Sequence, residues 1–70
     1  MTGLVKRSFT LAGHRTSVAL EPEFWAVLDR IAATTGRPTS ALVAELDAAR
    51  DAQGRPLASL LRVHALKNAG

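Results

Sequence analysis

One short segment, residues 14–20, limits most strongly what this chain can fold into. Its side chains alternate in character, with Thr16, Val18 and Leu20 on one parity and Arg15, Ser17 and Ala19 on the other. A period of two residues predicts a half-buried strand over 15–20. A lone strand leaves its backbone donors and acceptors unpaired, so this strand needs a partner.

The sequence offers two alternative partners for this strand. Residues 7–11 alternate weakly, and Ala12-Gly13-His14 can form the loop of a hairpin that joins them to the 15–20 strand. The other partner is a second copy of the same strand in a homodimer, which also enlarges a core that is small for 70 residues. The chain has no cysteine, so no disulfide can supplement that core. We therefore predict a homodimer in which the 15–20 strand pairs with its own copy, with residues 1–5 as a flexible N-terminus.

Three helices are predicted after the strand, within a single domain over 1–70. Pro22 suits the first turn of a helix over 22–35, and Gly36 can end it in a left-handed cap. Thr39 can serve as the N-cap of a helix over 39–51, and Gly54-Arg55-Pro56 precedes a third over 57–67. The apolar side chains of the strand and the first two helices are predicted to form the dimer core: Val18, Leu20, Phe24, Trp25, Leu28, Ile31, Leu42, Val43 and Leu46.

The positive charge of the chain is concentrated at one end. Lys6, Arg7 and Arg15 lie in the first 20 residues without any acidic residue, whereas six basic and six acidic residues balance from Glu21 onward. A basic patch suits a polyanion, although charge on a mobile terminus can serve solubility alone. A two-stranded ribbon fits the major groove, so the Arg15 side of the strand is a candidate DNA-reading face. The simpler interpretation is that this side is merely solvated.

Catalytic chemistry has little support in the sequence. His14 and His64 are 50 positions apart and have neither cysteine nor a glycine-rich phosphate loop with them. We predict a protein that is not an enzyme and uses no cofactor or metal. Without a long apolar span or an apolar segment after Lys6 and Arg7, a cytoplasmic location is expected. Trp25 lies next to Phe24 in an amphipathic helix, which favours a core position over base stacking.

The order of strand, Glu-Pro helix, Gly turn and helix resembles the ribbon-helix-helix family of dimeric DNA-binding proteins. Two runs carry the resemblance, Ala12-Gly13-His14-Arg15-Thr16-Ser17 and Leu20-Glu21-Pro22-Glu23-Phe24-Trp25. With 57–66 as a C-terminal addition, they are similar to a subgroup of short bacterial members. The fold class implied is mostly α with a short β-ribbon, in an intertwined homodimer with an added third helix.

The resemblance also implies a function, a transcriptional regulator that inserts a β-ribbon into the major groove of double-stranded DNA. The outward strand residues Arg15, Ser17 and Ala19 are then expected to read bases. Backbone phosphates are expected to lie against the start of the second helix and the N-terminal cations, at Lys6, Arg7, Arg37, Thr39 and Ser40. Such proteins are often repressors or antitoxins, so a toxin is a possible protein partner beside the second copy of the chain.

Two other interpretations remain open. If residues 7–11 pair with the 15–20 strand, a strand-paired dimer has four strands, and at about 4.8 Å per strand it is too wide for a groove of about 12 Å. The chain is then a dimerisation or protein-interaction module without DNA binding. A helix-turn-helix interpretation makes the 39–51 helix the DNA reader. Its exposed side is uncharged or acidic, which suits DNA poorly: Ala44, Glu45, Ala48 and Asp51.

Overall fold

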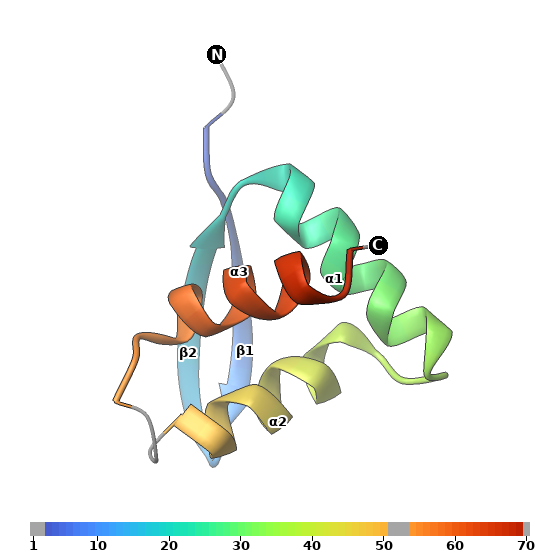
Figure 1. Ribbon diagram of the computed structural model, residues 1–70. Helices are drawn as coiled ribbons and strands as arrows, with labels where there is room; N and C mark the ends of the chain where they lie inside the picture. The colour runs from blue at the N-terminus through green and yellow to red at the C-terminus, as the bar shows by residue number, and fades with distance from the viewer. Residues whose placement is uncertain (1–2, 51–53, 70) are drawn as a thin grey trace.

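The chain folds as a β-hairpin with three helices packed on one of its faces (Figure 1). The computed structural model describes residues 3–50 and 54–69. In Figure 1 both strands lie behind the helices, and α3 crosses in front of them. The elements in order are β1 (Val5–Leu11), β2 (His14–Leu20), α1 (Pro22–Thr34), α2 (Thr39–Arg50) and α3 (Leu57–Lys67). The predicted fold class, a short β-ribbon followed by helices with a third helix at the C-terminal end, is confirmed.

The partner of β2 is the upstream segment of the same chain. β1 pairs with it antiparallel, from Val5 opposite Leu20 to Leu11 opposite His14. The strand begins at Val5, within the terminus that was predicted to be flexible, and residues 1–2 of that terminus lie outside the described residues. His14 belongs to β2 and not to the loop. No second strand lies along the other edge of β2 within residues 3–50 and 54–69, so pairing with a second copy stays a prediction.

A two-residue turn connects the strands, and both of its residues have a positive φ, 51° at Ala12 and 81° at Gly13. Two-residue hairpins of the I′ type require this conformation because its twist matches that of the strands. Glycine adopts it without steric cost, but an alanine Cβ meets the neighbouring carbonyl. Ala12 therefore holds the turn at some cost in stability.

Replacing Ala12 with asparagine is expected to raise the free energy of unfolding by about 0.5–1 kcal/mol, since asparagine tolerates the left-handed conformation. Urea unfolding followed by circular dichroism measures the change. Ala12→Val is the matched control, and it should destabilise the protein because a β-branched residue is strained at positive φ. Equal stability of the two variants would contradict this account of the turn.

Local chemistry sets the ends of the first two helices. Pro22 is the first residue of α1, as predicted. After α1, Gly36 has φ 70°, and the amides of Gly36 and Arg37 donate to the carbonyls of Ala33 and Ala32, which is the Schellman pattern. The prediction that Thr39 caps α2 is wrong. The carbonyl of Pro38 accepts from the Leu42 amide, so Thr39 is already helical, and its hydroxyl donates to Asp29 instead.

The core lies between the hairpin and the helices, and it is complete within one chain. Leu20, Leu28, Val43 and Leu61 are fully buried, and Trp25 is 2% exposed. The predicted core position of Trp25 is confirmed. The first helix ends at Thr34 and the second at Arg50, whereas Asp51, the predicted end of the second, lies outside the described residues. No helix within residues 3–50 and 54–69 is long and apolar enough to span a membrane.

Candidate nucleic-acid interface

The pairing of β1 with β2 divides the hairpin side chains between two faces. Side chains turned toward the helices are buried or half-buried: Arg7, Phe9, Leu11, Thr16, Val18 and Leu20. The opposite side, called the outer face below, carries three cross-strand pairs, Lys6 with Ala19, Ser8 with Ser17, and Thr10 with Arg15. All of these residues are exposed except Ala19, which is half-buried. The strand residues Arg15, Ser17 and Ala19 thus share their face with three residues of β1.

The outer face is positively charged and polar. Lys6 and Arg15 lie at its diagonally opposite corners, and it contains no acidic residue. At its centre the hydroxyls of Ser8 and Ser17 are hydrogen-bonded at 3.0 Å. The three helices pack on the other side of the hairpin and leave this face uncovered (Figure 1). A polar ribbon with two cations and hydroxyl groups offers donors and acceptors to a polyanion.

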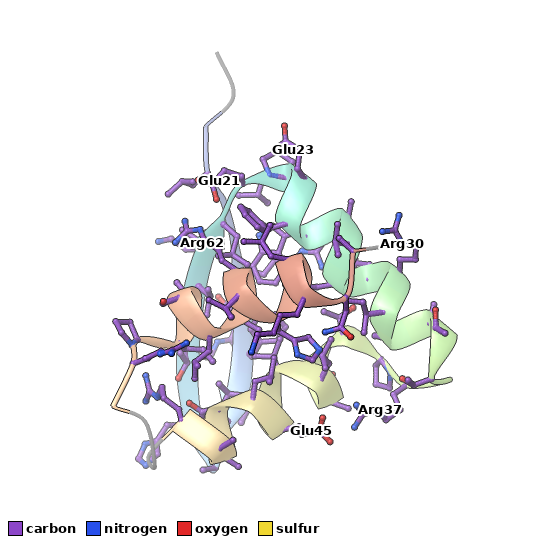
Figure 2. All side chains as sticks on the ribbon, viewed as in Figure 1. Glu21, Glu23, Arg30, Arg37, Glu45 and Arg62 are labelled. Carbon is purple, nitrogen blue, oxygen red and sulfur yellow. The ribbon has the colours of Figure 1, made fainter. Side chains whose placement is uncertain are left out.

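Most other arginines of the chain are held by acidic partners. Arg37 pairs with Glu45 at 3.3 Å and Arg62 with Glu21 at 3.1 Å, and Figure 2 shows both pairs. Arg50 pairs with Asp47, and Arg7 with Asp29. Lys6 and Arg15 take part in none of the ion pairs formed among residues 3–50 and 54–69. The cations on the outer face are therefore available to an external anion without breaking an internal pair.

Arg7 lies on the helix side of the hairpin and ties β1 to α1. Its two terminal nitrogens donate to the two carboxylate oxygens of Asp29 at 2.9 and 3.0 Å. The guanidinium also stacks 4.7 Å from the centre of the Trp25 ring, and the Trp25 indole donates to the Val5 carbonyl at 2.7 Å. The Thr39 hydroxyl donates to the same carboxylate at 2.6 Å, which adds α2 to the cluster. The predicted phosphate contact of Arg7 therefore competes with a bidentate internal pair.

The cluster shifts the ionisation of its members. Hydrogen bonds from Arg7 hold the pKa of Asp29 below its usual value of 3.8, and the Thr39 bond adds to this against the opposing effect of burial. The Asp29 carboxylate in turn raises the pKa of Arg7. Both changes favour the charged forms, as expected for two opposite charges in contact. The ion pair is stable across the physiological pH range.

Acid is expected to weaken this cluster. Because the folded pKa of Asp29 is depressed, its contribution to stability is complete above the unfolded value of 3.8 and is lost as the pH falls through the lower folded value. The carboxylate side chain is 44% exposed, so solvent screening limits the contribution to about 1 kcal/mol or less. Asp29→Asn should lower the stability at pH 7 and lose less stability between about pH 5 and pH 2 than the natural protein.

Urea unfolding at several pH values measures this difference. Glu21→Gln serves as a comparison, because it removes a different carboxylate whose pKa is also lowered. The pKa of Glu21 is lowered by its own backbone amide first and then by Arg62. Equal acid sensitivity of Asp29→Asn and the natural protein would contradict the role given to Asp29.

The predicted phosphate-binding turn before α2 is largely engaged within the chain. Arg37 binds Glu45, and the Thr39 hydroxyl binds the Asp29 carboxylate. Ser40 is exposed at the first turn of α2. An acidic group close to this helix start opposes a phosphate, since like charges repel. Sequence reasoning missed Asp29, because a carboxylate 22 positions from Arg7 gives no local signal of their contact.

The residues predicted for the dimer core lie in the core of a single chain. Six of them are buried there: Val18, Leu20, Trp25, Leu28, Leu42 and Val43. Phe24, Ile31 and Leu46 are only partly buried and pack against that core. The Arg62 guanidinium lies over the Phe24 ring, 5.9 Å from the ring centre. The core is therefore filled without a second copy, and of the nine residues predicted for the dimer core only these three retain surface that a partner can cover.

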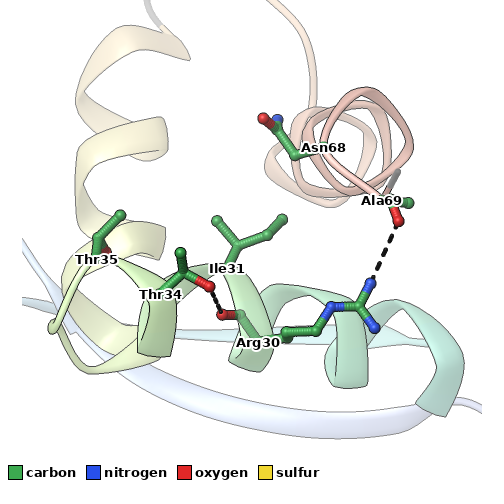
Figure 3. A pocket seen from close by; sticks show the side chains of 6 residues that line it. All are labelled: Arg30, Ile31, Thr34, Thr35, Asn68 and Ala69. Atoms are coloured by element: carbon green, nitrogen blue, oxygen red, sulfur yellow. Dashed lines mark hydrogen bonds between the residues drawn. The ribbon is translucent and has the colours of Figure 1, made fainter.

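A shallow pocket between the ends of α1 and α3 shows no sign of catalytic use (Figure 3). Its polar groups are bonded to the chain itself: Thr34 donates to the Arg30 carbonyl, Asn68 to the His64 carbonyl, and Arg30 to the Ala69 carbonyl. No group of three potential metal ligands from histidine, cysteine, aspartate and glutamate occurs within residues 3–50 and 54–69. The pocket therefore lacks the convergent polar groups that mark a ligand site.

Comparison with known proteins decides the family. A model of the ribbon-helix-helix domain matches residues 4–69. The chain belongs to the ribbon-helix-helix domain family. No curated protein matches the chain. Among solved structures, it is similar to an uncharacterized protein from Bordetella pertussis Tohama I, with 37% sequence identity and a TM-score of 0.80.

The similarity to the Bordetella protein covers 93% of this chain and 54% of that one. This ribbon-helix-helix chain thus spans just over half the length of its solved relative. Because the family match includes the whole of β1 and α3, the first strand and the third helix belong to the ribbon-helix-helix domain as matched. The predicted family is confirmed.

Proposed function

We propose that this ribbon-helix-helix protein binds double-stranded DNA through the outer face of its hairpin and acts as a homodimeric transcriptional regulator. The observation that carries the proposal is the outer face itself, an uncovered ribbon with Lys6 and Arg15 exposed and no acidic residue. Membership of a family whose members are typically DNA-binding regulators supports it. A two-stranded ribbon fits the major groove, which is about 12 Å wide.

The proposed contacts divide by side-chain chemistry. Arg15 and Ser17 are placed against base edges, and Ala19 offers an apolar contact to a thymine methyl group. Lys6 and Ser40 are the proposed backbone contacts whose side chains take part in none of the ion pairs or side-chain hydrogen bonds formed among the described residues 3–50 and 54–69. Arg7, Arg37 and Thr39 must exchange an acidic partner for a phosphate, so their expected contribution to affinity is smaller.

The proposed homodimer rests on the family and on the remaining apolar surface. Phe24, Ile31 and Leu46 are the predicted dimer residues that are only partly buried in one chain, so they are the ones proposed to contact the partner. A dimer joined there leaves each hairpin as a two-stranded ribbon. Sedimentation velocity of the natural protein and of Ile31→Glu measures this association, and an unchanged monomer for both would contradict it.

DNA binding is tested by fluorescence anisotropy of a labelled duplex at several salt concentrations. We expect binding that weakens as salt rises, with a slope in log affinity that falls by about 1 in Lys6→Ala, because each phosphate contact contributes about 0.9. Arg15→Ala is expected to weaken binding about tenfold or more. Arg30→Ala removes the same charge from the exposed side of α1 and should change little. An undetectable interaction at low salt would overturn the proposal.

A second candidate function rests on the open edge of β2. Two copies paired along this edge would form a four-stranded sheet, and three spacings of about 4.8 Å separate its outer strands by about 14 Å, more than the groove admits. The chain would then be a dimerisation or protein-interaction module. A dimer that persists in Ile31→Glu, together with absent DNA binding, is the result that favours this alternative.

A further inference from the structure

β1 contributes half of the outer face, so its residues bear on what the hairpin recognises. Lys6, Ser8 and Thr10 are exposed on the same side as the β2 residues expected to read bases. A ribbon formed within one chain places two different strands against the groove. A ribbon built from two copies of one strand is symmetric, but this one is not, because each cross-strand pair joins a residue of β1 to a residue of β2.

The order of side chains along the ribbon is specific. Arg15 and Thr10 lie beside the turn, the two serines lie at the centre, and Lys6 with Ala19 lies at the open end. The small central pair allows the backbone to approach the groove floor closely. The long cationic side chains reach outward at the two ends, on opposite strands. Arginine and lysine both favour guanine, whose O6 and N7 are acceptors in the major groove.

The distance between Lys6 and Arg15 along the ribbon predicts how far apart the two base pairs that they contact should lie. Lys6 is opposite Ala19, four residues along β2 from Arg15. At about 3.4 Å per residue this is about 14 Å along the ribbon. Bases of one strand rise by about 3.4 Å along the duplex axis. A ribbon that lay along the axis would therefore span about four base pairs. Because the groove runs obliquely to the axis, the axial distance is shorter, and the cations are separated by roughly three to four base pairs.

We infer that one hairpin recognises a duplex segment with two guanines about three to four base pairs apart, one bound by Arg15 and the other by Lys6 of β1, which then contacts a base in place of the backbone phosphate proposed above. Ser8 and Ser17 contact the base pairs between them, and Thr10 lies beside Arg15 at the turn end. The serine hydroxyls, bonded to each other at 3.0 Å, are already oriented on this face and exchange that bond for base edges. The inference rests on the proposed DNA binding and adds β1 as a reading strand.

The test is competition anisotropy at one fixed low salt concentration. The competitors are A·T-rich duplexes with two G·C pairs separated by one to seven base pairs. The natural protein is expected to prefer a separation of three or four by about tenfold over the others, the size of one good guanine contact. Lys6→Ala and Arg15→Ala should each remove the dependence on one guanine. Arg15→Lys should keep the salt dependence and weaken the preference for guanine.

The outcomes separate the two levels of the proposal. Failure to bind any duplex at low salt overturns the proposed function. Binding without a preferred spacing, or a preference that Lys6→Ala leaves unchanged, overturns only the reading role of β1. Both cations are exposed, so the variants should remain folded, and circular dichroism checks this.

Discussion

Replacing Trp25 with alanine is expected to lower the free energy of unfolding by about 3–5 kcal/mol. Trp25 is 2% exposed and fills the space between α1 and the hairpin, with its ring centre 5.8 Å from that of Phe9. The substitution removes this packing, the Arg7 stacking and the indole hydrogen bond to Val5 together. The free energy of unfolding of a domain is about 5–15 kcal/mol, and small domains lie near the lower limit. Much of the variant should therefore be unfolded at room temperature.

Urea unfolding followed by circular dichroism measures the loss, because the variant has no tryptophan fluorescence. Trp25→Phe is the matched control, which keeps a ring but removes the indole donor to the Val5 carbonyl. It should cost about 1–3 kcal/mol, from the lost hydrogen bond and the smaller ring. A loss below about 1 kcal/mol in Trp25→Ala would show that the tryptophan does not hold the hairpin on the helices.

Val18→Asp is expected to unfold the protein, whereas Ser17→Asp should leave the fold intact and abolish DNA binding. Val18 is 5% exposed on the helix side of β2, so a carboxylate there is buried without a partner and costs at least about 3 kcal/mol. Its neighbour Ser17 points to the outer face, where an aspartate remains hydrated. There it repels phosphates close to Arg15.

Circular dichroism and DNA anisotropy of these adjacent variants separate the two faces of one strand. A folded Val18→Asp, or an unfolded Ser17→Asp, would contradict the assignment of faces. Because Val18 is buried within a single chain, unfolding of Val18→Asp gives no information on dimerisation. Ile31→Glu, on the partly buried surface, addresses that question instead.

Much of the fold was predictable because its signals are local. The alternation over 15–20 fixed which residues of β2 face the helices, since strand side chains alternate strictly. Pro22 and Gly36 marked the start and end of the first helix through their own backbone preferences. The resemblance of the strand and the Glu-Pro helix start to the ribbon-helix-helix family was equally local, and the match over residues 4–69 confirmed it.

The candidate site was less predictable because it depends on which partner each residue meets. The basic N-terminal region was visible in the sequence, but Lys6 and Arg7 looked equivalent there. The pairing of β1 with β2 turns Lys6 to the outer face and Arg7 toward Asp29. The local sequence likewise suggested that Thr39 caps the second helix, whereas its hydroxyl donates to the carboxylate of Asp29, ten positions earlier.

The sequence by itself determined the elements, the two faces of the 14–20 strand and the excess of positive charge near the N-terminus. Only the tertiary structure decided that β2 takes its first partner from its own chain, through a turn at Ala12 and Gly13. The physical reason is that side-chain periodicity reports burial on either side of a strand, whereas backbone pairing occurs at its edges. An edge satisfied by β1 and one satisfied by a second copy leave the same pattern in the sequence.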